Sequence, residues 1–516
     1  MPEYKIPGVY IEEVEIGVKP IRGVSTSLAG FLGETERGPE NPILISSFGD
    51  YMQFYGGYLP NSYLTYAVDG FFRNGGKNCY IARICSSDSD PSTLDLDIDG
   101  TNSIKMTAVG PGDWGNRIWA KIENATLQSS FLFKLTLLYY STMPPVTIVD
   151  PTESSNRNDP NRREPDVIEV YDNLSIDPKS PDFYIKKVNG TSKIVVLSSM
   201  IHGRPINVAL TALSWGNSGS AISISDYNPT GSKTNSLGEI IYTGLAGFKK
   251  IDEISIVCAP NENGIPTLRD AIVSHCEELK DRFAVLQTKE NDANNIDTLR
   301  PGRESKYAAL YFPWLKVLDP LTNSHKLIPP GGHIAGIYAR SDTERGVHKA
   351  PANEALRGVA ALQVNLNKEQ QSKLNPRGVN VIRAFPGRGH VVWGARTIST
   401  DPLWKYINIR RLFLYIEESI EEATQWVIFE PNNERLWTRI TAAVTQFLTR
   451  VWRDGALMGT TPEEAFFVKC DRSTMTQDDI DNGRLIVLIG VAPVKPAEFV
   501  IFRIGQTAAG AEVTEL

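Results

Sequence analysis

An apolar, strand-forming run lies close to the end of this 516-residue chain. The residues Phe499–Phe502 are all large and apolar, and the surrounding segment 498–505 has the length of a β-strand. An arm at the other end, 4–13, also favours an extended chain, although Pro7 and Gly8 interrupt it. A terminal strand has an open edge unless something pairs with it. The partner is either the subunit's own sheet or the sheet of a neighbouring copy, and these residues alone leave both open.

Two amphipathic helices are predicted upstream of the terminal strand. The first covers 405–423, where apolar residues recur at spacings of three and four, and the second covers 436–451. The segment Pro431–Asn433 breaks the pattern between them and offers an N-cap. Strand-like runs follow at 465–470 and 484–494. The C-terminal region is therefore expected to combine a helix pair with a β-sheet.

The same region resembles a known family. The run 399–419, which begins Ser-Thr-Asp-Pro-Leu-Trp, resembles the C-terminal signature of contractile tail sheath proteins, and the likeness continues through 429–433, Trp437 and 483–484. The block 329–351 resembles a second signature of that family. Such proteins form the sheaths of contractile phage tails, R-type bacteriocins and extracellular contractile injection systems. Their terminal arms weave into neighbouring subunits, so the resemblance favours the neighbouring copy as the partner of both arms.

The N-terminal portion predicts a strand at 27–33, helices at 47–55 and 62–72, and a buried strand at 78–84. Further along, the composition shifts toward Ser, Asp, Asn and Pro up to about residue 237, and strand-like runs replace helical periodicity. We interpret this stretch as an inserted β-rich domain on the outside of an assembly. The resemblance agrees, because sheath proteins tolerate such insertions.

A βαβ unit is predicted next, with strands at 253–258 and 282–286 and a helix at 265–279 between them. This order implies a parallel sheet. The resemblance implies that this central domain is subtilisin-like in fold. Further strands are predicted at 308–317, 380–384 and 390–396, and further helices at 332–339 and 353–362.

The expected fold class is therefore α/β and α+β with several domains. A subtilisin-like α/β central domain carries an inserted β-rich outer domain, and a C-terminal helix pair with a β-sheet is completed by the terminal arms of neighbours. The expected boundaries are 1–26 for the N-terminal arm and linker, 27–90 with 238–397 for the discontinuous central domain, 91–237 for the outer domain, and 398–516 for the C-terminal domain with its arm at 495–508.

Composition narrows the class of partners. The formal charge is -7, which argues against a nucleic-acid backbone as the main partner. No apolar run approaches the roughly 20 residues that span a bilayer, and no signal peptide is recognisable. The five cysteines match no disulfide or zinc pattern and are expected to be reduced. We expect no cofactor, no metal, no nucleic acid and no direct membrane insertion.

A subtilisin-like fold raises the question of a protease. The histidines best placed for catalysis are His333 and His348, near Asp342, but no nucleophile segment of the Gly-x-Ser-x-Gly type is present. The segment Gly110–Gly115 has the spacing G-x-G-x-x-G, yet a strand-like run follows it instead of a helix, so we interpret it as a turn. The chain is therefore not expected to be an enzyme.

The candidate functional residues are of three kinds. Arm contacts between subunits are expected from Val9, Tyr10, Ile11, Phe499, Val500, Ile501 and Phe502. Hinges are expected in the linkers 13–24 and 492–497, at Gly17, Pro20, Pro493 and Pro496. Charges that face an inner tube or a neighbour, or that are simply solvated, are Glu417, Glu418, Glu421 and Glu422 on the first C-terminal helix and Arg435, Arg439, Arg450 and Arg453 on the second.

The resemblance implies a mechanical function. The chain is expected to polymerise with itself as stacked helical rings around an inner tube, between baseplate and terminal cap proteins, and to contract so that the tube is driven through a target envelope. Such particles are assembled in the bacterial cytoplasm and act as part of a phage tail or as a released particle. Two alternatives stay open: an inactive or cryptic subtilisin-like hydrolase, and a non-contractile baseplate or shell component.

Overall fold

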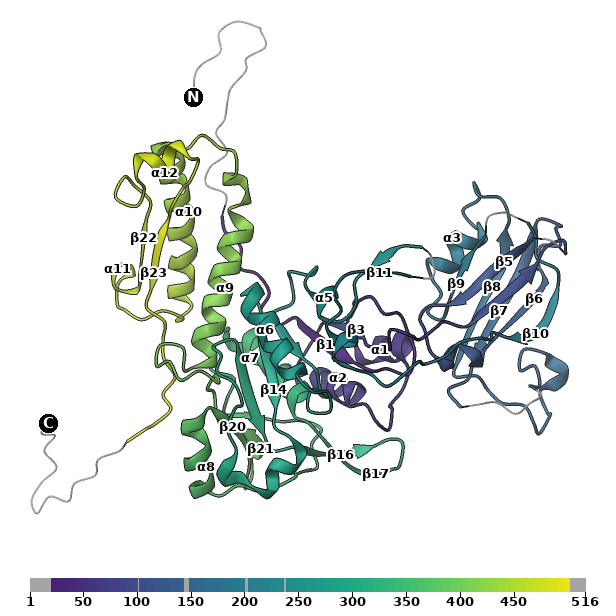
Figure 1. Cartoon of the computed structure of the whole chain (residues 1–516), viewed down its shortest axis with the longest axis horizontal. Coiled ribbons are helices and arrows are strands. Elements are labelled where there is room, and N and C mark those ends of the chain that lie inside the picture. The colour runs from purple at the N-terminus through teal and green to yellow at the C-terminus, as the bar shows by residue number, and fades with distance from the viewer. Residues whose placement is uncertain (1–19, 101, 143–147, 200–202, 236–237, 502–516) are drawn as a thin grey trace, which may run out of the picture.

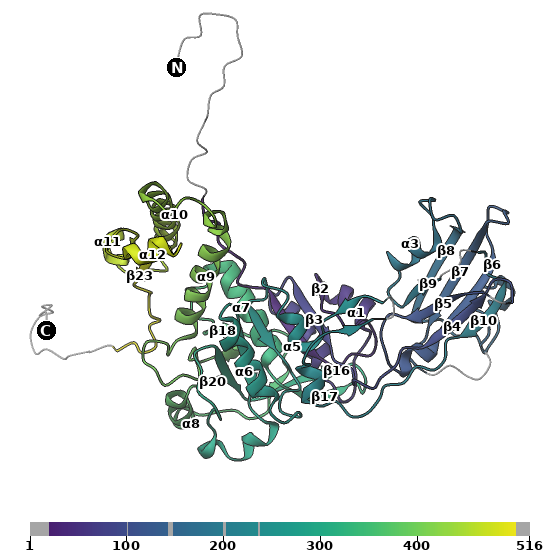
Figure 2. The same cartoon turned by 45° about the horizontal axis from the view of Figure 1, so that its top comes forward.

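The structure is a computed structural model that describes residues 20–100, 102–142, 148–199, 203–235 and 238–501. Three hydrophobic cores organise it: one around a large mixed sheet, one inside a β-rich domain, and one around two long helices. Figures 1 and 2 show the β-rich domain at one end of the molecule and the long helices α9 and α10 at the other, with the large sheet between them.

The large sheet has nine strands in the order β18-β21-β20-β15-β14-β13-β1-β3-β2. Its middle strands, from β20 to β3, run parallel, and the strands added at either edge are antiparallel. Strand β1 pairs in parallel with β13, so the chain segments before and after the β-rich domain join in one sheet. The strands are β1 Ala29–Gly33, β2 Ile43–Ile45, β3 Cys79–Arg83, β13 Ile256–Cys258, β14 Phe283–Gln287, β15 Ala308–Phe312, β18 Glu354–Ala355, β20 Val379–Phe385 and β21 Gly389–Val392.

Helices cover this sheet because its parallel strands are buried on both faces. Strand β13, helix α6 and strand β14 form the predicted βαβ unit, with β13 and β14 parallel. The predicted helices at 47–55, 62–72 and 332–339 are present as α1, α2 and α7. The helices are α1 Phe48–Tyr55, α2 Leu64–Arg73, α5 Gly244–Phe248, α6 Leu268–Leu279, α7 Gly331–Arg345 and α8 Lys368–Leu374, with short 3₁₀ turns η3 Glu290–Asn294, η4 Ile296–Thr298 and η5 Asn375–Arg377.

Two predictions for this region are wrong. The segment 353–362 was expected to be helical, but Asn353 and Gly358 have φ angles of 62° and 77°, which interrupt a helix. The segment instead forms two short strands, β18 and β19. The single strand expected at 308–317 is divided in two at Pro313. Its second part joins a separate sheet of β16 Leu315–Asp319, β17 Ser324–Ile328 and β19 Ala361–Leu362.

The β-rich domain packs two antiparallel sheets around its own core. Leu135 and Leu137 on β7 point inward with Ile104 and Met106 on β5. One sheet holds β4 Thr93–Asp97, β5 Ser103–Ala108 and β9 Val195–Ser198, and the other β6 Ile118–Asn124, β7 Leu132–Tyr139, β8 Val167–Ser175 and β10 Val208–Ala212. Smaller elements of this domain are η1 Asp113–Arg117, η2 Ser154–Asn156 and α3 Tyr184–Asn189. The chain then returns to the large sheet through α4 Ile224–Tyr227, whose Tyr227 belongs to the core of that sheet, and through the paired strands β11 Lys233–Thr234 and β12 Ile240–Ile241.

The third core holds the two predicted helices, α9 Ile407–Ala423 and α10 Glu434–Arg453. Asn433 caps α10 as expected, since its side-chain oxygen accepts from the backbone N–H of Leu436 at 3.1 Å. The strands predicted at 465–470 and 484–494 pair over shorter stretches. The remaining elements are η6 Gln425–Val427, α11 Pro462–Ala465, β22 Phe466–Lys469, α12 Gln477–Asp481 and β23 Leu488–Val491.

Candidate functional site

Helix α9 belongs to two cores at once. Ile407 and Leu414 contribute to the core of the large sheet, whereas Leu412 and Ile416 contribute to the core around α10. A single rigid helix therefore joins the two regions mechanically.

A buried ion pair fixes this helix to α7. The guanidinium of Arg411 donates to both carboxylate oxygens of Asp342, at 2.9 and 2.6 Å. Both side chains are buried. Thr26 joins the pair, because its hydroxyl donates to Asp342 at 2.7 Å and its carbonyl accepts from Arg411 at 2.7 Å. The pair therefore ties together α7, α9 and the N-terminal linker, which leaves Asp342 committed to structure.

The N-terminal linker lies against the helix pair from Ile21 onward. The Ile21 side chain is 1% exposed within the core of α9 and α10, and its carbonyl accepts from Arg450. The backbone N–H of Val24 donates to the hydroxyl of Ser419 at 3.1 Å. Of the predicted hinge residues, Pro20 lies exposed just before this anchored stretch, and Gly17 lies outside the described residues. Any bending is therefore expected before Ile21.

The C-terminal linker is held in its first half. The carbonyl of Ala492 accepts from Met458 N–H at 2.8 Å, and Val494 N–H donates to the carbonyl of Ala456 at 3.1 Å. The predicted hinge Pro493 lies between these two bonds and forms a bridge with Leu457. The second predicted hinge, Pro496, lies beyond them, so it is the better placed of the two to bend.

A carboxylate holds the chain again at Glu498. Arg396 donates to its two oxygens at 2.8 and 2.7 Å, Asn375 donates at 2.8 Å, and the Tyr406 hydroxyl donates at 3.0 Å. The ammonium group of Lys405 is 3.8 Å away. Burial alone would raise the pKa of Glu498, but the hydrogen bonds from Arg396 and Asn375 and the Arg396 charge lower it to about 2.

The arm residues that follow Glu498 are strongly exposed. Phe499, Val500 and Ile501 are 71%, 69% and 80% exposed, and they form no strand within this single chain. Figures 1 and 2 show this segment leaving the body of the molecule. A strand was predicted over 498–505, and the described part lacks a partner in the same subunit. The other predicted arm contacts, Val9, Tyr10, Ile11 and Phe502, lie outside the described residues.

The C-terminal sheet has two strands in the part of the chain that the structure describes. Strands β22 and β23 pair with each other in antiparallel register, from Phe466 opposite Val491 to Lys469 opposite Leu488. Phe466 points into the core, whereas Phe467 and Leu488 are 53% and 52% exposed. Each strand therefore keeps one edge without a strand partner, and an isolated two-stranded sheet is marginal in water.

A second exposed apolar feature lies between α9 and α10. Phe429 is fully exposed and has a φ angle of 70°, an unusual conformation for a bulky side chain. The connection is nevertheless ordered, because the Asn432 amide accepts from the Trp437 indole at 2.7 Å and donates to the carbonyl of Arg484 at 3.1 Å. Sequence reasoning noted 429–433 as part of a family signature and Pro431–Asn433 as a helix break with an N-cap, but it did not identify Phe429 as a surface feature.

The predicted charges differ in their surroundings. Some are engaged within the chain: Glu417 pairs with Arg410, Arg450 binds the Ile21 carbonyl, and Arg439 lies 4.6 Å from the centre of the Trp426 ring. Arg435 and Arg453 are exposed on α10. The remaining acidic residues, Glu418, Glu421 and Glu422, line a groove between α9 and the central domain.

This groove is acidic. Its volume is about 890 Å³, and Asp252, Glu253 and Asp281 face the three glutamates of α9 across it. Burial raises the pKa of Glu418 to about 7, and repulsion from Asp281 and Glu421 contributes. The prediction treated these glutamates as charges along one helix and missed the carboxylates that the central domain places opposite them.

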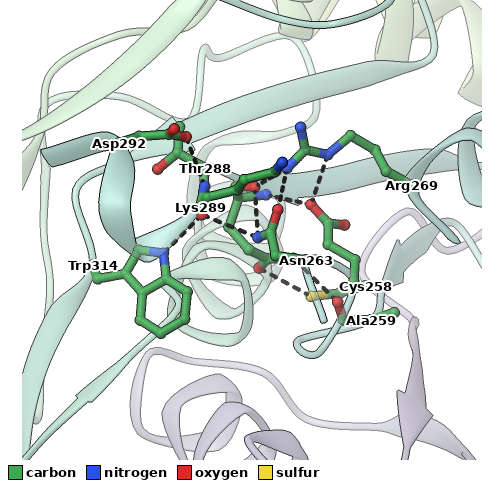
Figure 3. A network of polar contacts seen from close by, with 10 residues as sticks. Cys258, Ala259, Asn263, Arg269, Thr288, Lys289, Asp292 and Trp314 are labelled. Carbon is green, nitrogen blue, oxygen red and sulfur yellow. Dashed lines mark hydrogen bonds and ion pairs between the residues drawn. The ribbon is translucent and has the colours of Figure 1, made fainter. Parts of the chain in front are cut away.

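A polar network at the carboxyl ends of β13 and β14 is the most enzyme-like arrangement among the described residues (Figure 3). Glu262 is buried there and accepts from Gln287 N–H at 2.9 Å and from Arg269 at 3.3 Å. The thiol of Cys258 is also buried beside Gln287, and burial holds its pKa well above the ordinary value, with the Glu262 charge contributing. A protonated, enclosed thiol is a poor nucleophile, so we assign this network to packing.

The two histidines considered for catalysis are not oriented by Asp342, which binds Arg411 and Thr26. His333 is buried, and a Cβ on Gly70 would come within 2.3 Å of its ring, so glycine is needed there for α2 to approach α7. Burial lowers the pKa of His333 to about 4, with a smaller effect of Arg73, and burial also lowers the pKa of His348. Both are therefore neutral at physiological pH.

The segment Gly110–Gly115 leads into the short 3₁₀ turn η1, which begins at Asp113, and then into strand β6, as the strand-like run after it predicted. A Cβ on Gly110 would meet the carbonyl of Gly38 at 2.2 Å, so its glycine serves a close backbone approach. Within the described ranges, no cluster of three or more potential metal ligands occurs, and no helix is long and apolar enough to cross a bilayer.

Comparison with known proteins agrees with this architecture. Residues 240–398 match the phage tail sheath protein central domain, and residues 399–507 match the phage tail sheath C-terminal domain. The tail sheath protein of Vibrio phage KVP40 is 26% identical over 300 residues, 54% of this chain and 44% of that protein. The tail sheath protein of Burkholderia phage BcepMu is 26% identical over 199 residues, 37% of this chain and 40% of that protein. The matched region thus spans less than half of these curated relatives.

Solved structures extend the likeness to the whole fold. The sheath of an extracellular contractile injection system, the PVC sheath complex in its contracted state, has a TM-score of 0.59 at 23% identity and covers 98% of this chain and 99% of that one. The contracted helical sheath of the anti-feeding prophage has a TM-score of 0.59 at 24% identity, with 98% and 100% coverage. A sheath tail protein from Listeria innocua has a TM-score of 0.59 at 13% identity, with 92% and 96% coverage.

The fold is thus the mixed α/β, multidomain fold of contractile sheath proteins. The two adjoining domain matches, together with the named relatives, identify the family more closely. The chain belongs to the phage tail sheath protein family.

Proposed function

We propose that this chain is a sheath subunit that polymerises helically, as stacked rings, around an inner tube and contracts to drive that tube through a target envelope. The observation that carries the proposal comes from the described residues of the subunit: the sheet β22–β23 has two strands there, and the apolar arm Phe499–Ile501 has no strand partner among them. If the arm of one copy pairs with the sheet of another, the arm gains a strand partner and an open edge of the sheet is covered.

Strand addition of this kind would be favourable in two ways. Each main-chain hydrogen bond contributes about 0.5–1.5 kcal/mol net. Covering the exposed rings and aliphatic side chains of the arm and of Phe467 and Leu488 contributes about 25 cal/mol per Å² of apolar surface. The N-terminal arm contacts Val9, Tyr10 and Ile11 are proposed to act in the same way on a further copy. Neighbouring subunits would then stay connected while they change their packing.

The remaining assignments follow from the same proposal. We propose the domain boundaries expected from the sequence, with a subtilisin-like central domain and with Pro20 and Pro496 as the best placed hinges. The proposed partners are further copies of this chain, an inner tube, and baseplate and cap proteins, in a particle assembled in the bacterial cytoplasm. Two of the similar sheath structures are in a contracted state, which supports contraction as the working step.

Electron microscopy of the purified chain tests polymerisation. We expect the full-length chain to form hollow tubes, and we expect two deletions, of residues 1–13 and of residues 499–516, each to block their growth while the subunit stays folded. Tubes of normal length from both deletions would contradict strand exchange. Closed rings from the full-length chain, without tubes, would instead favour a baseplate component.

A further inference from the structure

The two terminal segments are anchored on opposite parts of the subunit. The N-terminal segment leads into β1 of the central sheet, yet Ile21 is buried in the core of α9 and α10 and is held there by Arg450. The C-terminal segment follows β23 of the C-terminal domain, yet Glu498 is bound by residues that precede α9. Each segment therefore crosses to the other domain before it leaves the molecule.

We propose that this crossed anchoring directs the arms, and that Glu498 is the positioning residue that sets where the C-terminal arm leaves the subunit toward a second copy. The proposal rests on the proposed function, because it assumes that Phe499–Ile501 pairs with a neighbour. Beyond that function, it names Glu498 as the contact that orients the arm, and it states that the first residue of the arm is held by the central domain.

The geometry at Glu498 suits this role. Its carboxylate receives four donated hydrogen bonds, two of them from the fork of Arg396, and a paired carboxylate of this kind is strongly oriented. Arg396 is fixed in turn, because its third nitrogen donates to the carbonyl of Asn375 at 3.0 Å. The ionisable groups that contact Glu498 are Arg396, Lys405 and Tyr406.

The position of Glu498 in the chain is equally informative. The stretch 495–497 before it makes no backbone hydrogen bond with another described residue, and Phe499 directly after it is exposed. Without the carboxylate contacts, the last fixed point of the chain would be Val494, four residues earlier. The arm would then sample many directions, and docking would have to order it at an entropic cost that a pre-positioned arm avoids.

Crossed anchoring has a mechanical consequence. The base of the C-terminal arm moves with the central sheet, whereas the base of the N-terminal arm moves with the helix pair. A rotation of one domain against the other would therefore pull the two arms in different directions. A neighbour that binds the C-terminal arm would therefore be coupled to the orientation of the central sheet, and one that binds the N-terminal arm to the orientation of the helix pair.

The first test measures the arm in the dissolved subunit. Methyl NMR of Val500 and Ile501 in the full-length chain, at a concentration below that of polymerisation, reports how freely they move. We expect Glu498→Ala to increase their mobility most and Glu498→Gln less, and we expect both to lower the melting temperature, because the buried Arg396 guanidinium loses its charged partner. Glu344→Gln, which removes an exposed charge on α7, is the matched control and should change neither.

The second test measures assembly, and it separates the two proposals. We expect Glu498→Ala to slow tube growth about tenfold, measured by light scattering, since the arm remains present but undirected. Removal of 499–516 should abolish growth. If that truncation grows normally, strand exchange fails. If the truncation blocks growth while Glu498→Ala leaves both methyl mobility and growth at wild-type values, the positioning role is overturned and the proposed function stands.

Discussion

The two sheets at the ends of α9 differ in how complete they are. The central sheet has nine strands, and its parallel middle is bordered by antiparallel strands at both edges. The C-terminal sheet has two strands within the described residues, and large apolar side chains remain exposed on it. The central sheet is a self-sufficient scaffold. The C-terminal sheet is stable only because one face of it packs on α10, and it is suited to receive strands from elsewhere.

The largest effect is expected where the incomplete sheet depends on its helices. Phe447→Ala opens a cavity in the core of α9 and α10, and it should lower the free energy of unfolding of that region by about 3–5 kcal/mol. Phe467→Ala removes a ring that is 53% exposed and lies over Gly490 on the paired strand, so it should lower the stability of the subunit by no more than about 1 kcal/mol. Urea unfolding of both variants, followed by tryptophan fluorescence, measures the difference.

Tube growth completes this comparison. Phe467→Ala is expected to slow tube growth even though the subunit stays folded. If the C-terminal sheet serves only the stability of its own subunit, the variant should instead grow tubes as fast as the wild type. Normal growth of the Phe467→Ala tubes would show that this face of the sheet receives no partner strand.

The central sheet should instead respond to pH through Glu262. Burial raises the pKa of this carboxyl to about 7 from an ordinary value of 4.5, so folding favours the protonated form. The stability that the protonated Glu262 side chain gives the folded protein is present in full below pH 4.5 and is lost as the pH rises through 7. Glu262→Gln has a neutral side chain at every pH. At pH 8 its free energy of unfolding should therefore exceed that of the wild type by about 1–3 kcal/mol.

Thermal melting at pH 5 and pH 8 measures the Glu262 effect, with Glu344→Gln as the control for a general loss of charge. A wild-type-like pH profile for Glu262→Gln would show that Glu262 is ionised in the folded protein and that Arg269 compensates its burial.

A smaller effect is expected in the acidic groove between the two regions. The raised pKa of Glu418 means that its protonated form is favoured in the folded chain, so stability is lost as the pH rises from 4.5 through 7. Glu418→Gln should raise the melting temperature slightly at pH 8 and not at pH 4. Glu430→Gln, an exposed glutamate in the connection after α9, provides the comparison. An equal rise in the melting temperature of Glu418→Gln at pH 4 and pH 8 would show that repulsion between carboxylates in the groove is not the cause.

The smallest effect on the isolated subunit is expected at Phe429. The ring is fully exposed, so Phe429→Ala should change the free energy of unfolding by less than about 0.5 kcal/mol and leave the melting temperature nearly unchanged. We expect slower tube growth, because a rigidly held aromatic side chain in a strained backbone conformation is suited to anchor a partner. Phe429→Gly, which relaxes the φ angle, separates the strain from the ring: it should stabilise the subunit slightly.

Much of the local structure could be predicted from the sequence. The two amphipathic helices, the Asn433 cap and the βαβ unit around α6 agree with the structure, because each depends on spacing and capping over a few turns. Positions that depend on a special backbone angle were missed: the segment after Asn353 was expected to be helical, although two positive φ angles forbid it. The exposed ring of Phe429 was missed for the same reason.

The residues around the chain ends show where sequence reasoning stops. The apolar run Phe499–Phe502 and the family signatures were readable because they are contiguous, and they indicated a sheath protein with terminal arms. The contacts of Glu498 come from Arg396, Asn375 and Tyr406, roughly a hundred residues away, and those of Ile21 come from α10. A single glutamate before an apolar run does not reveal such partners.

The sequence by itself thus determined most of the elements and the apolar ends, because these depend on short-range periodicity, and its contiguous signature segments indicated the family by resemblance. Only the tertiary structure decided that the two terminal segments are anchored on opposite domains, that Asp342 serves Arg411 instead of a histidine, and that acidic residues from two regions face one groove. Each of these depends on side chains that folding brings together from distant positions in the chain, and contacts between such positions leave no local pattern in the sequence.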